Sequence, residues 1–205
     1  MRYAHRMTKQ TAIEQIRSEI LALSASPLYA YRVENGFQPV IGAGSLDAEV
    51  VFVGEAPGKQ EAKTGQPFVG ASGRVLDELL ASIHLAREDV YITNVVNDRP
   101  PDNRDPKPEE IVRYAPFLER QLAVIQPRII ATLGRFAMDF MLTRYATPRA
   151  GGKIGDLHGR PIDAILPYGA GVVLPLYHPA VALYNRSQRP LLEQDFQTLR
   201  NLLDA

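Results

Sequence analysis

The chain lacks cysteine altogether, and its 205 residues carry 23 basic and 23 acidic side chains, so the formal net charge is zero. Without cysteine there can be no disulfide, no thiolate nucleophile and no cysteine-ligated metal. A molecule without net charge has no overall field that attracts a polyanion. A nucleic-acid site would therefore have to be a local basic patch.

Long apolar segments are also missing. No run approaches the roughly 18 apolar residues of a transmembrane helix, and the opening MRYAHRMTKQ lacks the apolar stretch of a secretory signal. We therefore expect no membrane contact and a cytoplasmic location. Hydrophobic residues make up 45% and charged residues 22% of the chain, as in an ordinary globular protein. The length suits one domain that spans residues 1–205.

Short β-branched runs alternate along the chain with segments of helical periodicity. The pattern predicts strands at 49–54, 89–94, 128–134 and 171–178, and helices at 9–23, 72–83, 107–125, 135–145 and 189–203. Residues 27–47 are predicted as a loop, and residues 146–171 as loops with a small hairpin, because both stretches contain Gly and Pro. The alternation indicates an α/β fold in which helices cover both faces of a parallel sheet.

Three of the four predicted strands are followed or ended by a single polar side chain. These residues are Glu55, Asn94 and His178, and the remaining strand stops at Gly134. In a parallel sheet wrapped by helices, ligands bind beyond the carboxyl ends of the strands. We therefore expect a carboxylate, an amide and an imidazole to meet in one pocket.

Several familiar sites are excluded by spacing. In GEAPGKQEAKTGQPFVGASG (54–73), Gly54 and Gly58 are too close together for a phosphate loop, and Lys59 is followed by Gln60 in place of Ser or Thr. The four histidines have no zinc-binding spacing, no G-x-S-x-G motif is present, and the aspartates after Asn94 do not form a calcium-binding ladder. A mononucleotide, zinc, serine-hydrolase or calcium site is therefore not predicted.

Four segments together resemble the successive motifs of family four uracil-DNA glycosylases. They are VFVGEAPGKQEAKTGQPFVGASGRVLDELL, VYITNVVNDRPPDNRDPKPEEI, YAPFLERQLAVIQPRIIATLG and LYHPAVALYNRS, and the resemblance runs from about residue 20 to the C-terminus. It implies a three-layer α/β/α sandwich around a four-stranded parallel sheet.

The resemblance implies a role for individual residues. Glu55 matches the carboxylate that handles the hydrolytic water, and His178 matches the histidine that stabilises the departing base. Phe68 matches the aromatic residue that stacks on uracil, although its residue type and setting alone fit a core anchor better. Asn94 matches the amide that reads the pyrimidine edge. The backbone around Ala56 and Gly58 is expected to line the pocket, and the loop 179–187 is expected to enter the duplex, with Leu183 or Tyr184 as the wedge and Arg186 on a phosphate.

The chain departs from the family at the four cysteines that hold an iron–sulfur cluster. Leu23, Ser26, Asp98 and Tyr114 stand at those positions, so the cluster cannot form. We infer that the cluster served to join the 23–28 loop to the 98–114 segment. The hypothesis is that Leu23 and Tyr114 pack into its place. No metal and no cofactor is expected.

The sequence therefore predicts a DNA repair glycosylase that hydrolyses the N-glycosidic bond of uracil in single- or double-stranded DNA. Since no nucleophilic lysine is evident, a monofunctional enzyme without strand cleavage is expected, acting as a monomer. Two alternatives remain open. One is a glycosylase for another deaminated base such as hypoxanthine, and the other is a non-catalytic protein that binds damaged or abasic DNA.

Overall fold

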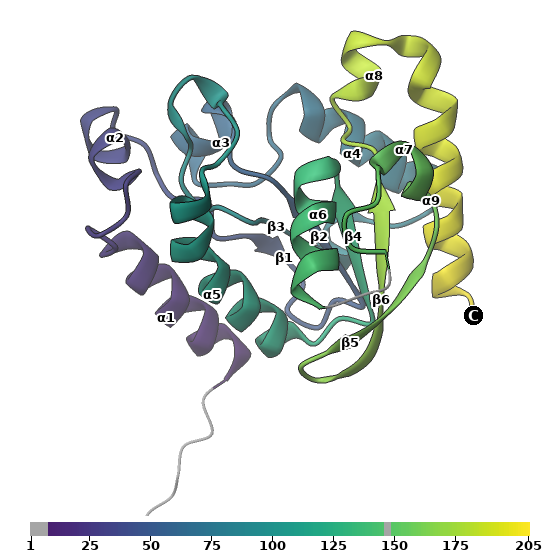
Figure 1. The fold of residues 1–205 in the computed structure, drawn as a ribbon, viewed down its shortest axis with the longest axis horizontal. Coiled ribbons are helices and arrows are strands. Elements are labelled where there is room, and N and C mark those ends of the chain that lie inside the picture. Colours follow the sequence, from purple (N-terminus) through teal and green to yellow (C-terminus); the bar gives the residue numbers. More distant parts are fainter. Residues whose placement is uncertain (1–7, 146–148) are drawn as a thin grey trace, which may run out of the picture.

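A computed structural model describes residues 8–145 and 149–205. Its centre is one sheet in which the described strands follow the order β1-β3-β2-β4-β6-β5 (Figure 1). Four of them pair in parallel, namely β3 (Tyr91–Asn94), β2 (Val50–Gly54), β4 (Ile129–Leu133) and β6 (Gly169–Leu176). These are the four predicted strands, and they confirm the α/β fold class.

The predicted strand count was too low, because two short antiparallel strands extend the sheet. At one edge, β1 (Ala43–Gly44) pairs with β3, and at the other, β5 (Ile162–Leu166) pairs with β6. The first lies in a segment predicted as a loop, and its two residues are too few to give a periodic signal. The second forms the predicted hairpin.

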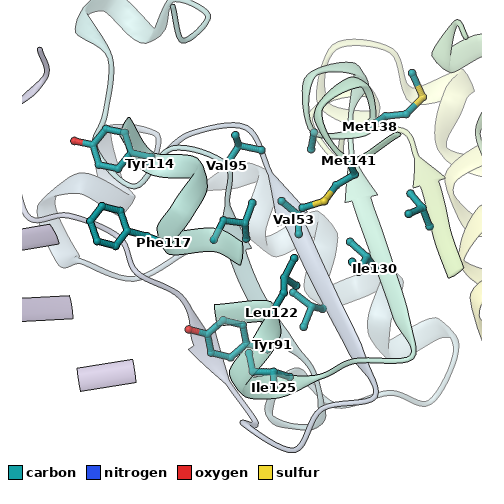
Figure 2. Close-up of a cluster of buried hydrophobic side chains, with 14 of the residues drawn as sticks. Val53, Tyr91, Val95, Tyr114, Phe117, Leu122, Ile125, Ile130, Met138 and Met141 are labelled. Carbon is teal, nitrogen blue, oxygen red and sulfur yellow. The ribbon is translucent and has the colours of Figure 1, made fainter. Parts of the chain in front are cut away.

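Helices cover both faces of the sheet, which gives the predicted three layers (Figure 1). One core is shared with α1 (Lys9–Leu21), α5 (Pro108–Ile125) and α6 (Arg135–Arg144), and the other with α4 (Ala71–Ser82) and α9 (Arg189–Leu203). The strands divide their side chains between the cores, since successive residues point to opposite faces. Val53 packs in the first core, which Figure 2 shows in part, whereas Phe52 stacks on Phe196 in the second.

Short helices occupy several connections. They are α2 (Tyr29–Glu34), α3 (Lys59–Thr64), α7 (Ile154–Leu157) and α8 (Val181–Tyr184), with 3₁₀ turns at Arg87–Asp89, Pro101–Asn103 and Arg186–Gln188. Of these, α2 and α7 lie in the two segments predicted as loops, because fewer than two turns give no readable period. Among the described residues, none of the helices has both the length and the apolar character needed to cross a bilayer.

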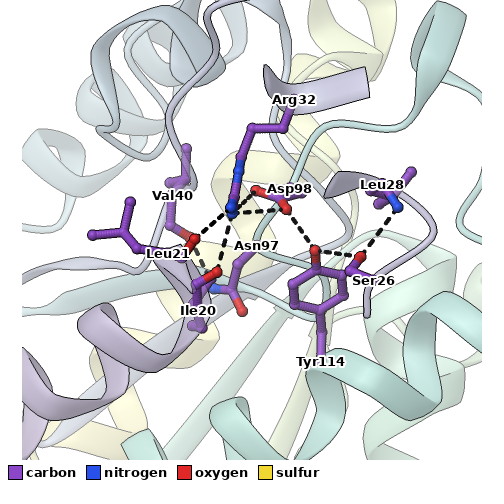
Figure 3. Close-up of polar contacts among 9 residues, drawn as sticks. All are labelled: Ile20, Leu21, Ser26, Leu28, Arg32, Val40, Asn97, Asp98 and Tyr114. Atoms are coloured by element: carbon purple, nitrogen blue, oxygen red, sulfur yellow. Dashed lines mark hydrogen bonds and ion pairs between the residues drawn. The ribbon is translucent and has the colours of Figure 1, made fainter. Parts of the chain in front are cut away.

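A buried polar network joins α1, α2 and α5 to the loop after β3 (Figure 3). The Tyr114 hydroxyl donates to Asp98 Oδ2 at 2.5 Å and accepts from Ser26 Oγ at 2.8 Å. Arg32 Nη1 lies 3.2 and 3.1 Å from the two Asp98 carboxylate oxygens. The same guanidinium also donates to the carbonyls of Ile20 and Leu21, at the end of α1, at 3.1 and 2.7 Å. Burial raises the pKa of Asp98, while Tyr114 and Arg32 act in the opposite direction.

The network occupies three of the four positions where the resemblance implies cluster ligands. Ser26, Asp98 and Tyr114 are all buried and bonded in one chain, whereas Leu23 is only partly buried against the core. The hypothesis that Leu23 and Tyr114 fill the place of the cluster by packing is therefore incomplete. Tyr114 is buried there, but it connects the two segments through its hydroxyl, and Arg32 supplies the positive charge.

Candidate active site

A cavity of about 380 Å³ opens at the carboxyl ends of the parallel strands. Seven of the nine predicted site residues line it, namely Glu55, Ala56, Gly58, Phe68, Asn94, His178 and Tyr184. Leu183 and Arg186 are not among the lining residues, although both lie close by in the chain segment that carries Tyr184. The sheet topology thus brings together side chains that are far apart in sequence.

Asn94 is the last residue of β3 and is only 2% exposed. Within the described chain its side-chain amide makes no hydrogen bond, so both its donor and its acceptor are available to a ligand in the cavity. The neighbouring strand β2 ends at Gly54, which pairs with Asn94. A Cβ atom at Gly54 would lie 2.4 Å from Asn94 Oδ1 and 2.9 Å from Phe68 Cε2. The missing side chain of Gly54 therefore makes the room in which the amide and the ring meet.

Phe68 is held in a strained loop between α3 and α4. Its φ of 50° is unusual for a bulky residue. Glu61 Oε1 accepts hydrogen bonds from the backbone N–H groups of Val69 and Gly70 at 3.0 and 2.8 Å, which fixes the chain directly after the ring. Sequence reasoning missed Glu61 as a cavity-lining residue, because its role depends on the loop folding back onto α3.

His178 lies two residues beyond the end of β6, and its ring centroid is 5.8 Å from that of Phe68. Burial lowers its pKa to about 4, so the imidazole is neutral at physiological pH. The backbone N–H of Ala180 donates to Nδ1 at 3.2 Å. Since Nδ1 acts as the acceptor, the single ring proton is on Nε2. His178 is therefore a neutral hydrogen-bond donor on the cavity wall.

Glu55 follows β2 directly and is partly buried. Burial raises the pKa of its carboxyl, the nearby charge of Asp105 adds to this, and Arg135 opposes it. Arg135 also lies 3.4 Å from Asp105. A carboxyl with a raised pKa inside a cavity is suited to orienting a water molecule or to accepting a proton from it.

The polar segment after β3 supplies a further part of the cavity lining, which sequence reasoning did not predict. Asn103, Arg104 and Asp105 all line the cavity. The Arg104 guanidinium binds both carboxylate oxygens of Glu110 at 2.9 and 2.5 Å, and Glu110 is 1% exposed. This bidentate pair ties this part of the lining to the first turn of α5, so the segment is ordered despite its loop-like composition.

The segment after His178 projects beyond the cavity. Tyr184 is 90% exposed and Leu183 is 45% exposed, at the end of the short helix α8. Arg186 follows in a 3₁₀ turn and is exposed, and no carboxylate of the described chain forms an ion pair with it. Two large exposed side chains beside a free cation are the features expected of the predicted wedge and phosphate contact. In the described ranges, no group of three or more His, Asp or Glu residues is placed to hold a metal ion.

Comparison with known proteins agrees with this geometry. The family model of the uracil DNA glycosylase superfamily matches residues 41–203. The chain belongs to this superfamily.

Individual relatives place the chain more closely within the superfamily. The type-4 uracil-DNA glycosylase of Sulfurisphaera tokodaii is 40% identical over 192 residues, which cover 93% of this chain and 84% of the relative. That of Archaeoglobus fulgidus is 40% identical over 198 residues, 93% of each protein. That of Thermotoga maritima is 38% identical over 198 residues, 96% of this chain and 97% of the relative. The predicted family-four resemblance is thus confirmed.

Gly54→Ala should impair the site selectively. The added methyl group would lie 2.4 Å from the Asn94 amide oxygen, so the amide or the Phe68 ring must move. We expect uracil release to fall about tenfold or more, with a loss of stability of about 1–3 kcal/mol from overpacking. Release rate and unfolding midpoint are measured together. Gly155→Ala is the control, because the nearest atom to its new Cβ is 3.8 Å away. Equal rates in the two variants would contradict this reading of Gly54.

Proposed function

We propose that the protein excises uracil from DNA by hydrolysing the N-glycosidic bond. The observation that carries the proposal is that the Asn94 amide, the Phe68 ring and the neutral His178 imidazole line one cavity. The family supports the reaction, since the relatives with about 40% identity are named uracil-DNA glycosylases. The roles of the individual residues are those that the family resemblance implies, and their placement around one cavity supports them.

Asn94 and Phe68 would recognise the base. The Phe68 ring offers a flat face for stacking, and the Asn94 amide offers the donor and the acceptor that uracil O4 and N3–H require. Cytosine presents the reverse pattern at these two positions. A buried polar group left without its partner costs about 1–3 kcal/mol. An amide that turns its N–H toward O4 and its oxygen toward N3–H would therefore select uracil over cytosine.

His178 and Glu55 would act on the bond itself. As the bond between C1′ and N1 breaks, its electron pair goes to the base and positive charge develops on the sugar. The Nε2–H of His178 would donate to uracil O2 and stabilise the departing anion, and one such donor contributes ~10²–10³ in rate. The Glu55 carboxylate would favour the cation electrostatically, orient the water that adds to C1′ and accept the proton that this water loses.

The decline in the rate of uracil release at low pH should reflect protonation of Glu55. Because burial raises the pKa of Glu55, its carboxylate is neutralised at a higher pH than an ordinary glutamate as pH falls, and the rate should decline with it. His178 should not contribute over this range, since its pKa is about 4. We expect Glu55→Gln to be slower and to lose the acid limb. An acid limb that persists in Glu55→Gln would assign it to another group.

DNA would be engaged by the exposed end of α8. A duplex must release the base from its stack, at a cost of a few kcal/mol, and Tyr184 or Leu183 could fill the space left behind. Arg186 would hold a phosphate.

Arg186→Ala should weaken DNA binding and reduce the slope of log affinity against log salt by about 1. Arg200→Ala is the control, because Arg200 lies near the other end of α9 and is paired with Asp204. A slope that Arg186→Ala leaves unchanged would remove this residue from the interface.

A substrate panel tests the proposal. Oligonucleotides that contain uracil, hypoxanthine or xanthine, single- or double-stranded, are incubated with the protein and then treated with alkali, which cleaves at abasic sites. We expect cleavage of uracil-containing strands only after alkali, because no lysine lines the described cavity to attack the sugar. Release of hypoxanthine in place of uracil would indicate a glycosylase for that deaminated base. Tight binding without release of any base would indicate a non-catalytic protein that binds damaged DNA. Sedimentation of the protein with and without DNA checks the expected monomer.

A further inference from the structure

A partly buried histidine–aspartate pair lies outside the cavity, beside a second hollow, and has no part in the proposed mechanism. His158 follows α7, and Asp195 lies on α9. His158 Nδ1 is 2.8 and 3.0 Å from the two Asp195 carboxylate oxygens. The Asp195 side chain is only 4% exposed and that of His158 is 21% exposed. A carboxylate as deeply buried as that of Asp195 is costly unless it is hydrogen-bonded, so the groups around it indicate its role.

The pair holds the chain just before His178. The backbone N–H of Tyr177 lies near Asp195 and opposes the rise in the pKa of its carboxyl that burial causes. The His158 ring lies against the Tyr177 ring with centroids 4.2 Å apart. The next residue along from His158, Gly159, donates its N–H to the carbonyl of Pro175 at 2.8 Å. The end of β6 is therefore held through its backbone and through one ring.

Gly159 shows how closely these groups approach. Its φ is +66°, and a Cβ there would lie 2.4 Å from Asp195 Oδ1. Only glycine fits both the conformation and the space. The chain after α7 is thus adapted to lie directly against the aspartate, and α7 and α9 both pack on β6 (Figure 1).

His178 itself has few restraints of its own. Within the described chain its ring takes part in one hydrogen bond, from the N–H of Ala180, and it contacts the Phe68 ring at the cavity wall. Tyr177 contacts His158 outside the cavity, while the adjacent His178 lines it. The position of the His178 imidazole therefore depends mainly on its backbone. Hydrogen bonds from the Gly134 N–H to the Leu176 carbonyl and from the Val181 N–H to the His178 carbonyl, both at 2.9 Å, hold this backbone toward β4 and α8, and Asp195 and His158 lie against it from α9 and α7.

We propose that His158 and Asp195 are positioning residues for His178. They set the backbone from which the imidazole reaches the departing base, and they touch no substrate themselves. This inference rests on the proposed function, because it assigns the pair's effect to the His178 step. A displacement of about 1 Å at a reacting group can cost up to about a hundredfold in rate.

A double-mutant cycle tests the proposal. We expect His158→Ala to lower the single-turnover rate of uracil release about ten- to hundredfold, with the affinity for uracil-containing DNA unchanged. In the His178→Ala background, His158→Ala should cause no further loss, since there is no imidazole left to position. A purely structural role would lower the rate by the same factor in both backgrounds, and that result would overturn the proposal.

Two further variants distinguish a positioning effect from an effect on folding. His158→Asn places an amide N–H near the position of Nδ1, so it should donate to Asp195 and restore most of the rate. Thr198→Ala, on the same helix as Asp195, is the matched control and should match the parent rate. Unfolding midpoints are measured for each protein. A His158→Asn variant as slow as His158→Ala, at an unchanged midpoint, would also overturn the proposal.

The cycle separates this proposal from the proposed function. If His178→Ala is slow but His158→Ala matches the wild-type rate, the positioning role fails and the function stands. If His178→Ala matches the wild-type rate, the role of His178 in the proposed function fails, and positioning fails with it. If the wild-type protein releases no uracil, the function itself is wrong.

Discussion

Asn94→Ala should abolish measurable uracil release while the protein stays folded. The substitution would leave uracil O4 and N3–H without partners, at about 1–3 kcal/mol for each group, so we expect the rate to fall roughly 10²- to 10⁴-fold. The fold should tolerate the change, because the Asn94 amide bonds to no group of the described chain. Single-turnover release from single- and double-stranded oligonucleotides is the measurement.

Asn97→Ala provides the matched comparison. Asn97 lies three residues further on, is fully buried and donates to the carbonyl of Val40 at 2.8 Å. Its loss should lower the free energy of unfolding by about 1–3 kcal/mol and leave base release largely intact at temperatures where the protein is folded. If Asn94→Ala kept the wild-type rate, the cavity would not be the base-binding site.

Arg32→Met should be among the most destabilising single changes. It removes the cation paired with a buried carboxylate. It also removes the side-chain donor to the Leu21 carbonyl and one of the donors to the Ile20 carbonyl, which keeps the Leu23 N–H. Breaking one partner of a buried pair costs about 3–5 kcal/mol. Because Asp98 is four residues from Asn94, release should fall as well when the loop loosens. Urea denaturation measures the free energy of unfolding, and thermal melts follow the midpoint.

Two further variants test whether the loss of stability in Arg32→Met comes from the unpaired carboxylate. Arg17→Met changes an exposed arginine on α1 and should have little effect. Adding Asp98→Asn to Arg32→Met removes the unpaired charge, so the double variant should recover part of the stability. An Arg32→Met protein as stable as Arg17→Met would mean that the network does not hold these segments together.

The parallel strands were predictable from sequence because each is a short run of buried β-branched residues. Of the two edge strands, only the hairpin strand Ile162–Leu166 was predicted, and its alternation of buried and exposed residues is typical of a half-exposed strand. Residues Ala43–Gly44 are too few to carry a pattern. The convergence of Glu55, Asn94 and His178 followed from topology alone, since parallel strands end at one edge.

Residues whose placement depends on loop closure escaped prediction. Glu61 accepts from backbone N–H groups, and Arg104 binds the buried carboxylate of Glu110. Both sets of partners come into place only once the chain has folded. The same holds for Arg32, which belongs to a segment predicted as a loop. His158 was considered only for its spacing to other histidines, because nothing local marks a partner 37 residues away. Long-range polar pairs leave no periodic trace in sequence.

The Ser26–Tyr114–Asp98–Arg32 network also bears on how the protein is made. Hydrogen bonds between side chains form as the chain collapses, whereas a metal cluster must be assembled and delivered by other proteins. Synthesis of this chain therefore places no demand on iron supply. Its segments would therefore stay joined whether or not iron is available.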